Sequence, residues 1–502
     1  MTSDIFYTPD KLIFQARAGL HLVLDPLTPN WFSTNSVGSL IIRRLDGRQT
    51  LDEVASEIAR VWHVSKERAV DDVHDFIRQG LSQRFIARTP FLDPPYLGRD
   101  LLSCPPRLDD IWLFVTNRSM PGNALSTFKD PLDRPPADLS RRSIDHLIAS
   151  AVELSARCAT VTGGEPFLHP EILSVLSDLA SVLDVTVITD GAFLTPETVS
   201  LLAGLKDPDR LALEVNLDGP DAFVHDALRG PSFEKTVAGI RRAVGSGLKV
   251  SVLTTVTNAN VRVLPDIAHV AGSLGARSQL LRVHESDSDR SLVALPDEVA
   301  TAFERLLSSP AHPDLRIANL DALQFRVSRG RGVKADLCTG GVNLLSVRFD
   351  GHVFPCPLLV TEDRFFCGRI PEKSLKEIWS ESPVLREFRT NSVQFRQGCS
   401  SCPLKFICSG GCTWRAFLSQ RLLSGGLSLA GCDPFCCAFR GILTRLLWDE
   451  ASRGLGVDLA NEDVYRKPVI YNCMAAPVDG ASSLGPFAVS PVSCARQDLG
   501  QP

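Results

Sequence analysis

The sequence lacks the features that mark a membrane protein or a protein that binds polyanions. No run of about 18 or more apolar residues occurs in its 502 residues, and no charged segment followed by an apolar run opens it at Met1. Its formal net charge is -5, so no basic field favours nucleic acid or anionic lipid. We therefore expect a cytoplasmic protein without nucleic-acid or membrane partners.

Cysteine is scarce before residue 330, where only Cys104 and Cys158 occur. Ten of the other twelve cysteines lie between Cys338 and Cys437. Because cytosolic thiols stay reduced, this dense group indicates metal or redox chemistry and not disulfides. The composition, 44% hydrophobic and 22% charged, is that of a folded globular protein, and the length suggests about three domains.

Residues 1–90 combine short apolar runs with helix signals. The run at 14–24 predicts a strand or hairpin, and 51–62 and 66–80 repeat apolar residues at helical spacing. Through DG-x-x-TLDEVA and QGL-x-x-x-FI, the segment resembles the PqqD-like family of leader-peptide-binding modules. The resemblance implies a winged-helix-like fold that captures a peptide as an added strand with a groove contact. The alternative is an ordinary winged helix that only packs on its neighbour.

Closely spaced prolines at 91–107 predict a linker, because they disfavour helix and extend the chain. From 108 to 330, apolar strands alternate with amphipathic helices. This alternation is typical of a parallel sheet with functional groups at the carboxyl ends of its strands. The sequence therefore predicts an α/β fold with a partial (β/α)6 TIM-type barrel.

Three motifs follow predicted strands of this barrel: VTGGEPFLHPEI at 161–172, Thr189-Asp190-Gly191, and NLDGPDAFVHDALRG at 216–230. They resemble the GGEP, T-N-G, and S-x-DG with HD-x-x-RG motifs of the radical-SAM family. Glycine has no side chain, so a ligand can approach its backbone closely. Packing of a tight turn is the alternative explanation for these glycines. The resemblance implies that S-adenosylmethionine would be bound by Gly163, Gly164, Glu165, Asn216 and Asp218.

The cysteines that define the radical-SAM family are missing. That family holds a [4Fe-4S] cluster through C-x3-C-x2-C after the first strand, where this chain has Ser119, Asn123 and Ser126. Thiolates suit iron because they are soft and charged, whereas hydroxyl and amide groups are hard and neutral. We therefore predict no radical-SAM cluster and no reductive cleavage of S-adenosylmethionine. Asn216 and Asp190 replace the usual serine and asparagine, which leaves cofactor binding without support.

The C-terminal cysteines follow one pattern, Cys338-x12-Gly351-x4-Cys356, Cys399-x2-Cys402-x5-Cys408-x3-Cys412, and Cys432. With CGRIPEKSLKEIW between its halves, this pattern resembles the SPASM domain of radical-SAM peptide-modifying enzymes. The resemblance implies two auxiliary [4Fe-4S] clusters. The first would be bound by Cys338, Cys356 and Cys412, and the second by Cys399, Cys402, Cys408 and Cys432.

The first cluster would have only three thiolate ligands, so its fourth iron is open or bound by another group. Candidates are Cys367, Cys436 and Cys437. A four-thiolate zinc site is the alternative for the second group. We place the cysteine-rich domain at 335–445 and an extension, partly flexible because of its Ala, Ser, Gly and Pro content, at 446–502.

Two functions fit these features. One is a non-catalytic scaffold or electron-relay subunit beside an active radical-SAM enzyme that modifies a ribosomal peptide. The other is a divergent peptide-modifying enzyme that uses an auxiliary cluster or the residual S-adenosylmethionine pocket. Both predict a precursor or leader peptide as partner. Six polar residues near strand ends are assigned no catalytic role: His225, Asp226, Arg229, Arg282, His284 and Glu285.

Overall fold

A ten-stranded sheet forms the centre of the protein. The computed structural model describes residues 5–92, 107–128, 135–286, 290–308, 312–329, 338–455 and 465–471. The strand order in the sheet is β12-β11-β10-β9-β8-β7-β6-β13-β14-β15. The strands are β6 (Asp110–Phe114), β7 (Cys158–Thr162), β8 (Asp184–Thr189), β9 (Leu211–Asn216), β10 (Lys249–Val256), β11 (Ser278–Val283), β12 (Arg316–Ile317), β13 (Leu344–Val347), β14 (His352–Phe354) and β15 (Gly368–Arg369).

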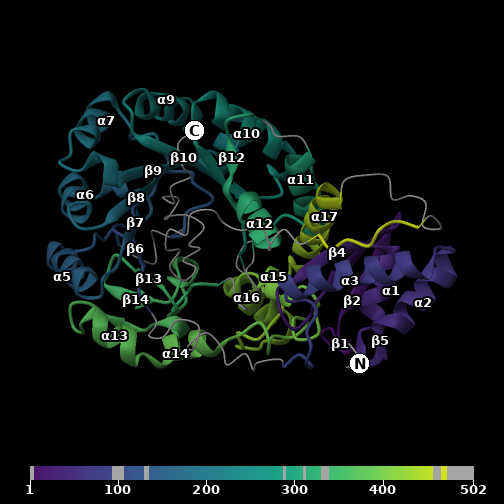
Figure 1. Cartoon of the computed structure of the whole chain (residues 1–502). Helices are drawn as coiled ribbons and strands as arrows, with labels where there is room; N and C mark the ends of the chain where they lie inside the picture. Colours follow the sequence, from purple (N-terminus) through teal and green to yellow (C-terminus); the bar gives the residue numbers. More distant parts are fainter. Residues whose placement is uncertain are drawn as a thin grey trace.

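Neighbouring strands from β12 to β13 are parallel, and only β14 and β15 are added antiparallel. Figure 1 shows the connecting helices on the outer side of the row of strands. Strands β6 to β11 are neighbours in chain order, which confirms the predicted α/β class with a partial TIM-type barrel. The helices are α5 (Arg141–Glu153), α6 (Ile172–Ala180), α7 (Pro196–Ala203), α8 (Ala222–Arg229), α9 (Phe233–Gly245), α10 (Leu264–Ser273), α11 (Pro296–Ser308) and α12 (Ala318–Arg329).

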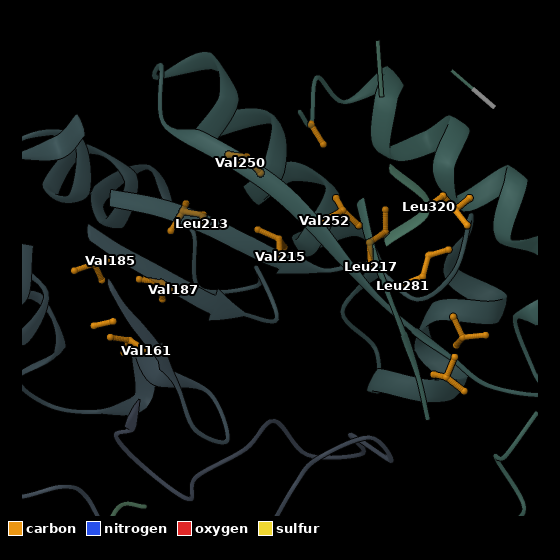
Figure 2. Close-up of a cluster of buried hydrophobic side chains, with 14 of the residues drawn as sticks. Val161, Val185, Val187, Leu213, Val215, Leu217, Val250, Val252, Leu281 and Leu320 are labelled. Carbon is orange, nitrogen blue, oxygen red and sulfur yellow. The ribbon is translucent and has the colours of Figure 1, made fainter. Parts of the chain in front are cut away.

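The two faces of the barrel sheet carry different side chains, because successive residues of a strand point to opposite sides. Leu213 and Val215 of β9 belong to the apolar core (Figure 2), which continues through the covering helices. Glu214 and Asn216 of the same strand therefore face the barrel interior. The chemistry-bearing residues of the barrel lie on this inner face.

The N-terminal module is the predicted winged-helix-like unit. Its antiparallel sheet has the order β2-β3-β4, so β2 and β4 are its edges. The predicted helix at 51–62 begins after a capping box in which the Thr50 and Glu53 side chains bond each other's backbone. The elements are β1 (Ile5–Tyr7), β2 (Ile13–Arg17), β3 (Leu20–Leu24), β4 (Trp31–Asn35), α1 (Ser36–Arg44), β5 (Asp46–Thr50), α2 (Leu51–Trp62) and α3 (Lys66–Ser82).

The cysteine-rich region packs beside the barrel and ends in a long helix. Its helices are α13 (Leu375–Glu381), α14 (Pro383–Thr390), α15 (Lys405–Cys408), α16 (Thr413–Ser424) and α17 (Cys436–Leu455). Helix α17 contacts α11 and α12 of the barrel and also β3 and β4 of the N-terminal module. It thereby holds the three parts of the chain together.

Two predicted segments are described only in part. The predicted linker at 91–107 lies almost entirely outside the described residues, and so does most of the extension at 446–502. Within the described ranges, no helix is both long and apolar enough to span a bilayer.

Candidate functional site

The three positions that replace the radical-SAM cysteines lie in the loop after β6. The Ser119 and Ser126 hydroxyl oxygens are 2.6 Å apart and share a hydrogen bond. The Asn123 amide nitrogen donates to the Asp190 carboxylate at 3.3 Å, and its oxygen accepts from the Leu125 backbone at 2.9 Å. The loop is therefore held by hydrogen bonds among the side chains that stand at the ligand positions.

The paired glycines after β7 are needed for the approach of this same loop. The Gly164 nitrogen donates to the Thr116 oxygen at 2.9 Å. A side chain at Gly163 would place its Cβ 2.5 Å from the Thr116 oxygen, and one at Gly164 would lie 1.9 Å from the Arg118 oxygen. Because these neighbours are backbone atoms, contact within the protein is enough to require glycine at both positions.

Glu165 is fully buried beside the glycines. Its carboxyl group accepts hydrogen bonds from the Thr189 hydroxyl at 2.9 Å, the Asp190 backbone at 2.8 Å and the Phe167 backbone at 3.1 Å. Burial, followed by the charge of Asp190, raises the pKa of Glu165 to about 8. Its described partners all belong to the protein itself.

A buried network of charges connects the second and third motifs. Arg229 bonds Asp218 at 2.5 Å and Asp190 at 2.9 Å, and the Asn216 amide donates to Asp190 at 3.0 Å. Burial disfavours the charged guanidinium of Arg229, but the Asp218 and Asp190 carboxylates outweigh this effect and raise the pKa of Arg229. The structure thus brings together Asn216 and Asp218, predicted as cofactor-binding, with Arg229. The sequence pattern alone did not reveal that Asp190 joins this network to Asn123.

Deeper in the barrel, Glu214 and Arg282 face each other across the interior. The Oε2 atom of Glu214 is buried and has no hydrogen-bond partner. Burial raises the pKa of Glu214 to about 7, although the nearby charge of Arg282 partly offsets the rise. The Arg282 guanidinium lies 5.9 Å from the centre of the Trp112 ring, and its charge also lowers the pKa of Cys356. This pair therefore lies between the barrel and the first cysteine group.

The first predicted cysteine group is brought together in the fold. A Cβ added to Gly340 would lie 3.3 Å from the Cys356 Cβ and 3.6 Å from the Cys338 sulfur. Burial raises the pKa of Cys356, and the neighbouring Cys338 and Cys412 thiols raise it further. Burial and the neighbouring thiols outweigh the positive charge of Arg282, so the Cys356 thiol favours the protonated form.

The second group contains Cys399, Cys402, Cys408 and Cys432, and it gains a fifth thiol. The Cys402 nitrogen donates to the Cys399 oxygen at 2.9 Å, which keeps these two residues in one turn. A hydrogen bond from the Cys432 thiol to Cys399 lowers the pKa of Cys399, and the Cys436 thiol in turn donates to Cys432. Cys436, considered above for the first cluster, therefore lies with the second group.

A buried ion pair joins the two cysteine groups. Asp433 follows Cys432 and accepts a hydrogen bond from the Cys412 backbone at 2.8 Å. The Arg415 guanidinium also lies 2.7 Å from the Asp433 carboxylate. The Arg415 side chain is 13% exposed and the Asp433 side chain 3% exposed. One carboxylate is thus bonded at the first group and adjacent in sequence to the second.

The donor sets of the two cysteine groups consist of thiols, the ligands that hold iron–sulfur clusters. Across the described parts of the chain, no three or more His, Cys, Asp or Glu side chains are arranged to hold one metal ion. A zinc site requires four sulfurs around one atom, whereas a [4Fe-4S] cluster distributes its cysteines over different irons. Closely spaced thiols of this kind suit the cluster geometry.

Three family models match the chain. They are the radical SAM superfamily at residues 119–268, coenzyme PQQ synthesis protein D (PqqD) at 21–86, and the iron-sulfur cluster-binding domain (SPASM) at 338–403. These matches confirm the predicted resemblance to radical-SAM/SPASM proteins with a PqqD-like module.

Curated relatives give the same picture. The mycofactocin maturase MftC of Mycobacterium ulcerans is 28% identical over 321 residues, covering 60% of this chain and 81% of the relative. The PqqA peptide cyclase of Methylocella silvestris is 27% identical over 322 residues, covering 61% of this chain and 81% of the relative. The chain is thus similar to radical-SAM/SPASM peptide-modifying proteins over most of their length.

Solved structures show the same fold. A structure of anSMEcpe with bound AdoMet and Cp18Cys peptide aligns with this chain at a TM-score of 0.54 and 15% identity. The alignment covers 69% of this chain and 100% of the anSMEcpe chain. SuiB of Streptococcus suis aligns with this chain at a TM-score of 0.50 and 12% identity. The alignment covers 85% of this chain and 98% of the SuiB chain. At these identities the likeness concerns the architecture alone.

Proposed function

The chain matches the radical-SAM, PqqD and SPASM families in three separate segments, and on that premise we propose that it serves the maturation of a ribosomal peptide as a partner subunit. In this role it is a scaffold or electron relay beside an active radical-SAM enzyme. The observation that carries the proposal is the hydrogen-bonded set Ser119, Asn123 and Ser126 at the positions of the cluster ligands.

The chemistry of these side chains opposes a radical-SAM cluster. A cluster in this loop would have to break the bond between Ser119 and Ser126 and the bond from Asn123 to Asp190. In return, the iron would gain neutral oxygen and nitrogen ligands in place of three thiolates. The predicted loss of this cluster is therefore kept as part of the proposal.

The cysteine groups supply the chemistry of the proposed relay. Cys338, Cys356 and Cys412 would hold one [4Fe-4S] cluster, and Cys399, Cys402, Cys408 and Cys432 another. Such clusters, when bound, accept and release single electrons. The Arg415–Asp433 pair between the groups fixes the Cys412 backbone and the start of the Cys432 turn relative to each other.

A peptide is the proposed partner of the module at residues 1–90. The relatives named as a maturase and a peptide cyclase, and the peptide bound to anSMEcpe, support this assignment. An exposed sheet edge binds an extended peptide through backbone hydrogen bonds, while pockets beside it select side chains. The barrel at 108–330 and the cysteine-rich domain at 335–445 would then face the modifying enzyme.

One observation favours the second candidate, a divergent peptide-modifying enzyme. Glu214 has a pKa of about 7 and an unpaired oxygen inside the barrel, beside Arg282. A carboxyl group with a pKa near neutrality suits general acid–base catalysis. The first cysteine group, with three thiols, would leave one iron available nearby.

The deciding experiment measures iron, sulfide and electron paramagnetic resonance on the anaerobically reconstituted full-length protein. We expect about eight irons per chain, spectra unchanged by S-adenosylmethionine, and no 5′-deoxyadenosine. The C356S and C408S variants should each lose about four irons, since each removes one ligand of a different group. A spectrum shifted by S-adenosylmethionine, or peptide turnover without a second enzyme, would favour the divergent enzyme.

A further inference from the structure

Residues 465–471, from the C-terminal extension, lie on the N-terminal module. The Ser33 nitrogen donates to the Tyr471 oxygen at 2.9 Å, and the Tyr471 nitrogen donates back to the Ser33 oxygen at 2.9 Å. Ser33 lies in β4, an edge of the β2-β3-β4 sheet. Figure 1 shows this yellow segment running beside β4 and α3. The segment therefore joins the β4 edge of the sheet through one antiparallel β-bridge.

Side chains of the module complete the backbone hydrogen bonds of this segment from both sides. On the β4 side, the Thr34 hydroxyl donates to the Val469 oxygen at 2.6 Å, and the Asn35 amide donates to the Lys467 oxygen at 2.8 Å. On the α3 side, the Gln79 side-chain oxygen accepts from the Ile470 nitrogen at 3.3 Å. The segment lies between β4 and α3, in what we call the β4–α3 groove.

The groove also has an apolar pocket, which Ile470 fills. This side chain is 7% exposed and belongs to the core cluster of the module, together with Phe32 of β4 and Phe76 of α3. Burial of an apolar side chain of this size stabilises the bound segment. Ile470 therefore acts as the anchor of the segment.

The other end of the groove is acidic and selects a cation. The Lys467 ammonium lies 2.6 Å from Asp75 and 3.8 Å from Asp72, both on α3. The Tyr465 hydroxyl donates to Asp72 at 2.6 Å, and the Arg68 guanidinium lies 4.9 Å from the centre of the Tyr465 ring. The hydrogen bond from Lys467 lowers the pKa of Asp75, so this carboxylate is charged at neutral pH.

The resemblance to PqqD-like modules implies a peptide held as an added strand with a groove contact, and we propose that the chain's own residues 465–471 compete with that peptide for the β4–α3 groove. A peptide from outside binds by displacing this segment. The groove accepts an extended peptide with an aliphatic residue for the Ile470 pocket and a cation three positions earlier, toward Asp72 and Asp75. The occupation of the groove by residues 465–471 is independent of the proposed function. Only the identification of the displacing peptide as a maturation substrate rests on that function.

Competition by a tethered segment has a predictable size. A segment in the same chain acts at an effective concentration of about 1 mM, so a segment whose own Kd for the groove is about 10 µM weakens the binding of a competing peptide about 100-fold. Release of the segment should restore the tighter binding. This fold-change is the quantity to measure.

The test uses the full-length protein and a fluorescent synthetic peptide, DVYRKPVIYN, which reproduces residues 463–472. In the Ile470→Asp variant, a charge replaces the anchor and releases the segment, while every groove residue of the module stays unchanged. We expect fluorescence anisotropy to give about 100-fold tighter peptide binding to Ile470→Asp than to the unaltered chain. Equal affinities for the two chains would overturn the proposal.

A second variant keeps the test decisive if Ile470→Asp disturbs folding. Lys467 is 53% exposed, so Lys467→Glu leaves packing intact and only places like charges together. This variant should also bind the labelled peptide more tightly than the unaltered chain. A peptide carrying the same Lys467→Glu change should bind the released groove at least tenfold more weakly, and Asp75→Lys should restore its binding. Absence of this charge rescue would contradict the assigned groove.

The outcome separates this inference from the proposed function. If the released groove binds DVYRKPVIYN but no precursor peptide binds, the groove assignment holds and the maturation role fails. If a precursor peptide binds equally well with the segment in place or released, the maturation role holds and the occupied groove fails.

Discussion

Glu214 should make the stability of the protein fall as the pH rises, and Glu214→Gln should remove this effect. The carboxyl group lies inside the barrel with one oxygen unpaired, and burial raises its pKa to about 7 from the ordinary value of 4.5. Between these two values, the folded chain keeps the proton and the unfolded chain has lost it. Because the unfolded state then binds fewer protons, the free energy of unfolding decreases with rising pH in this window and levels off above about pH 7.

The magnitude follows from the two pKa values. From pH 5 to pH 8, the difference in proton binding lowers the free energy of unfolding by about 2.5 kcal/mol. For a unit of the size of this barrel, such a loss corresponds to about 5–10 °C in the midpoint of thermal unfolding. Glutamine keeps the shape of the side chain without titrating, so the variant lacks this contribution at every pH.

The assay compares thermal unfolding of the wild type and Glu214→Gln in parallel buffers from pH 5 to pH 8. The difference between their midpoints should change by about 5–10 °C in favour of the variant as the pH rises. Glu298→Gln is the matched control, because its hydrogen bond from Arg262 lowers the Glu298 pKa and leaves that group ionised throughout this range. Parallel curves for wild type and Glu214→Gln would refute the buried, protonated state of Glu214.

Two further substitutions test the site. Asp433→Asn breaks the buried pair with Arg415 and should lower the free energy of unfolding by about 3–5 kcal/mol in urea, together with loss of iron. The control is Asp363→Asn, whose side chain is 87% exposed. It should change neither the free energy of unfolding nor the iron content. Gly164→Ala places a Cβ 1.9 Å from a backbone oxygen and should lower the midpoint of thermal unfolding. The control is Gly245→Ala, which has open space around the added Cβ. It should leave the stability unchanged or raise the free energy of unfolding by up to about 1 kcal/mol. Equal midpoints for the two glycine variants would contradict the close approach of the loop.

The sequence predicted the parts of the fold that local patterns encode. The helix at 51–62 was recognisable from its apolar spacing, and the structure confirms its limits. The alternation of strands and helices likewise predicted the parallel sheet. Cysteine spacing predicted the two groups of thiols, since ligands within each half are close in sequence.

Interactions between distant residues were beyond such patterns. The pairing of Ser33 with Tyr471 joins residues more than 400 positions apart, and a short segment that contains Pro468 has no periodicity to reveal it. The place of Cys436 beside Cys432 depends on the turn through Asp433, whose carboxylate caps the start of α17 by accepting from the Phe435 nitrogen at 3.0 Å. In both cases the partner is set by tertiary packing and not by local sequence.

The departures from the radical-SAM pattern form one connected unit in space. Asn123 stands where the family has a cysteine and Asp190 where it has an asparagine, and the two side chains bond each other at 3.3 Å. Asp190 in turn bonds Asn216, which replaces the usual serine, and the Arg229 cation. A buried carboxylate needs such donors, because an unpaired charge in this position would cost several kcal/mol. Since each of these side chains satisfies another, the Asn123 loop and the ends of β8 and β9 are joined by hydrogen bonds, and the departures from the family pattern are explained together and not one by one.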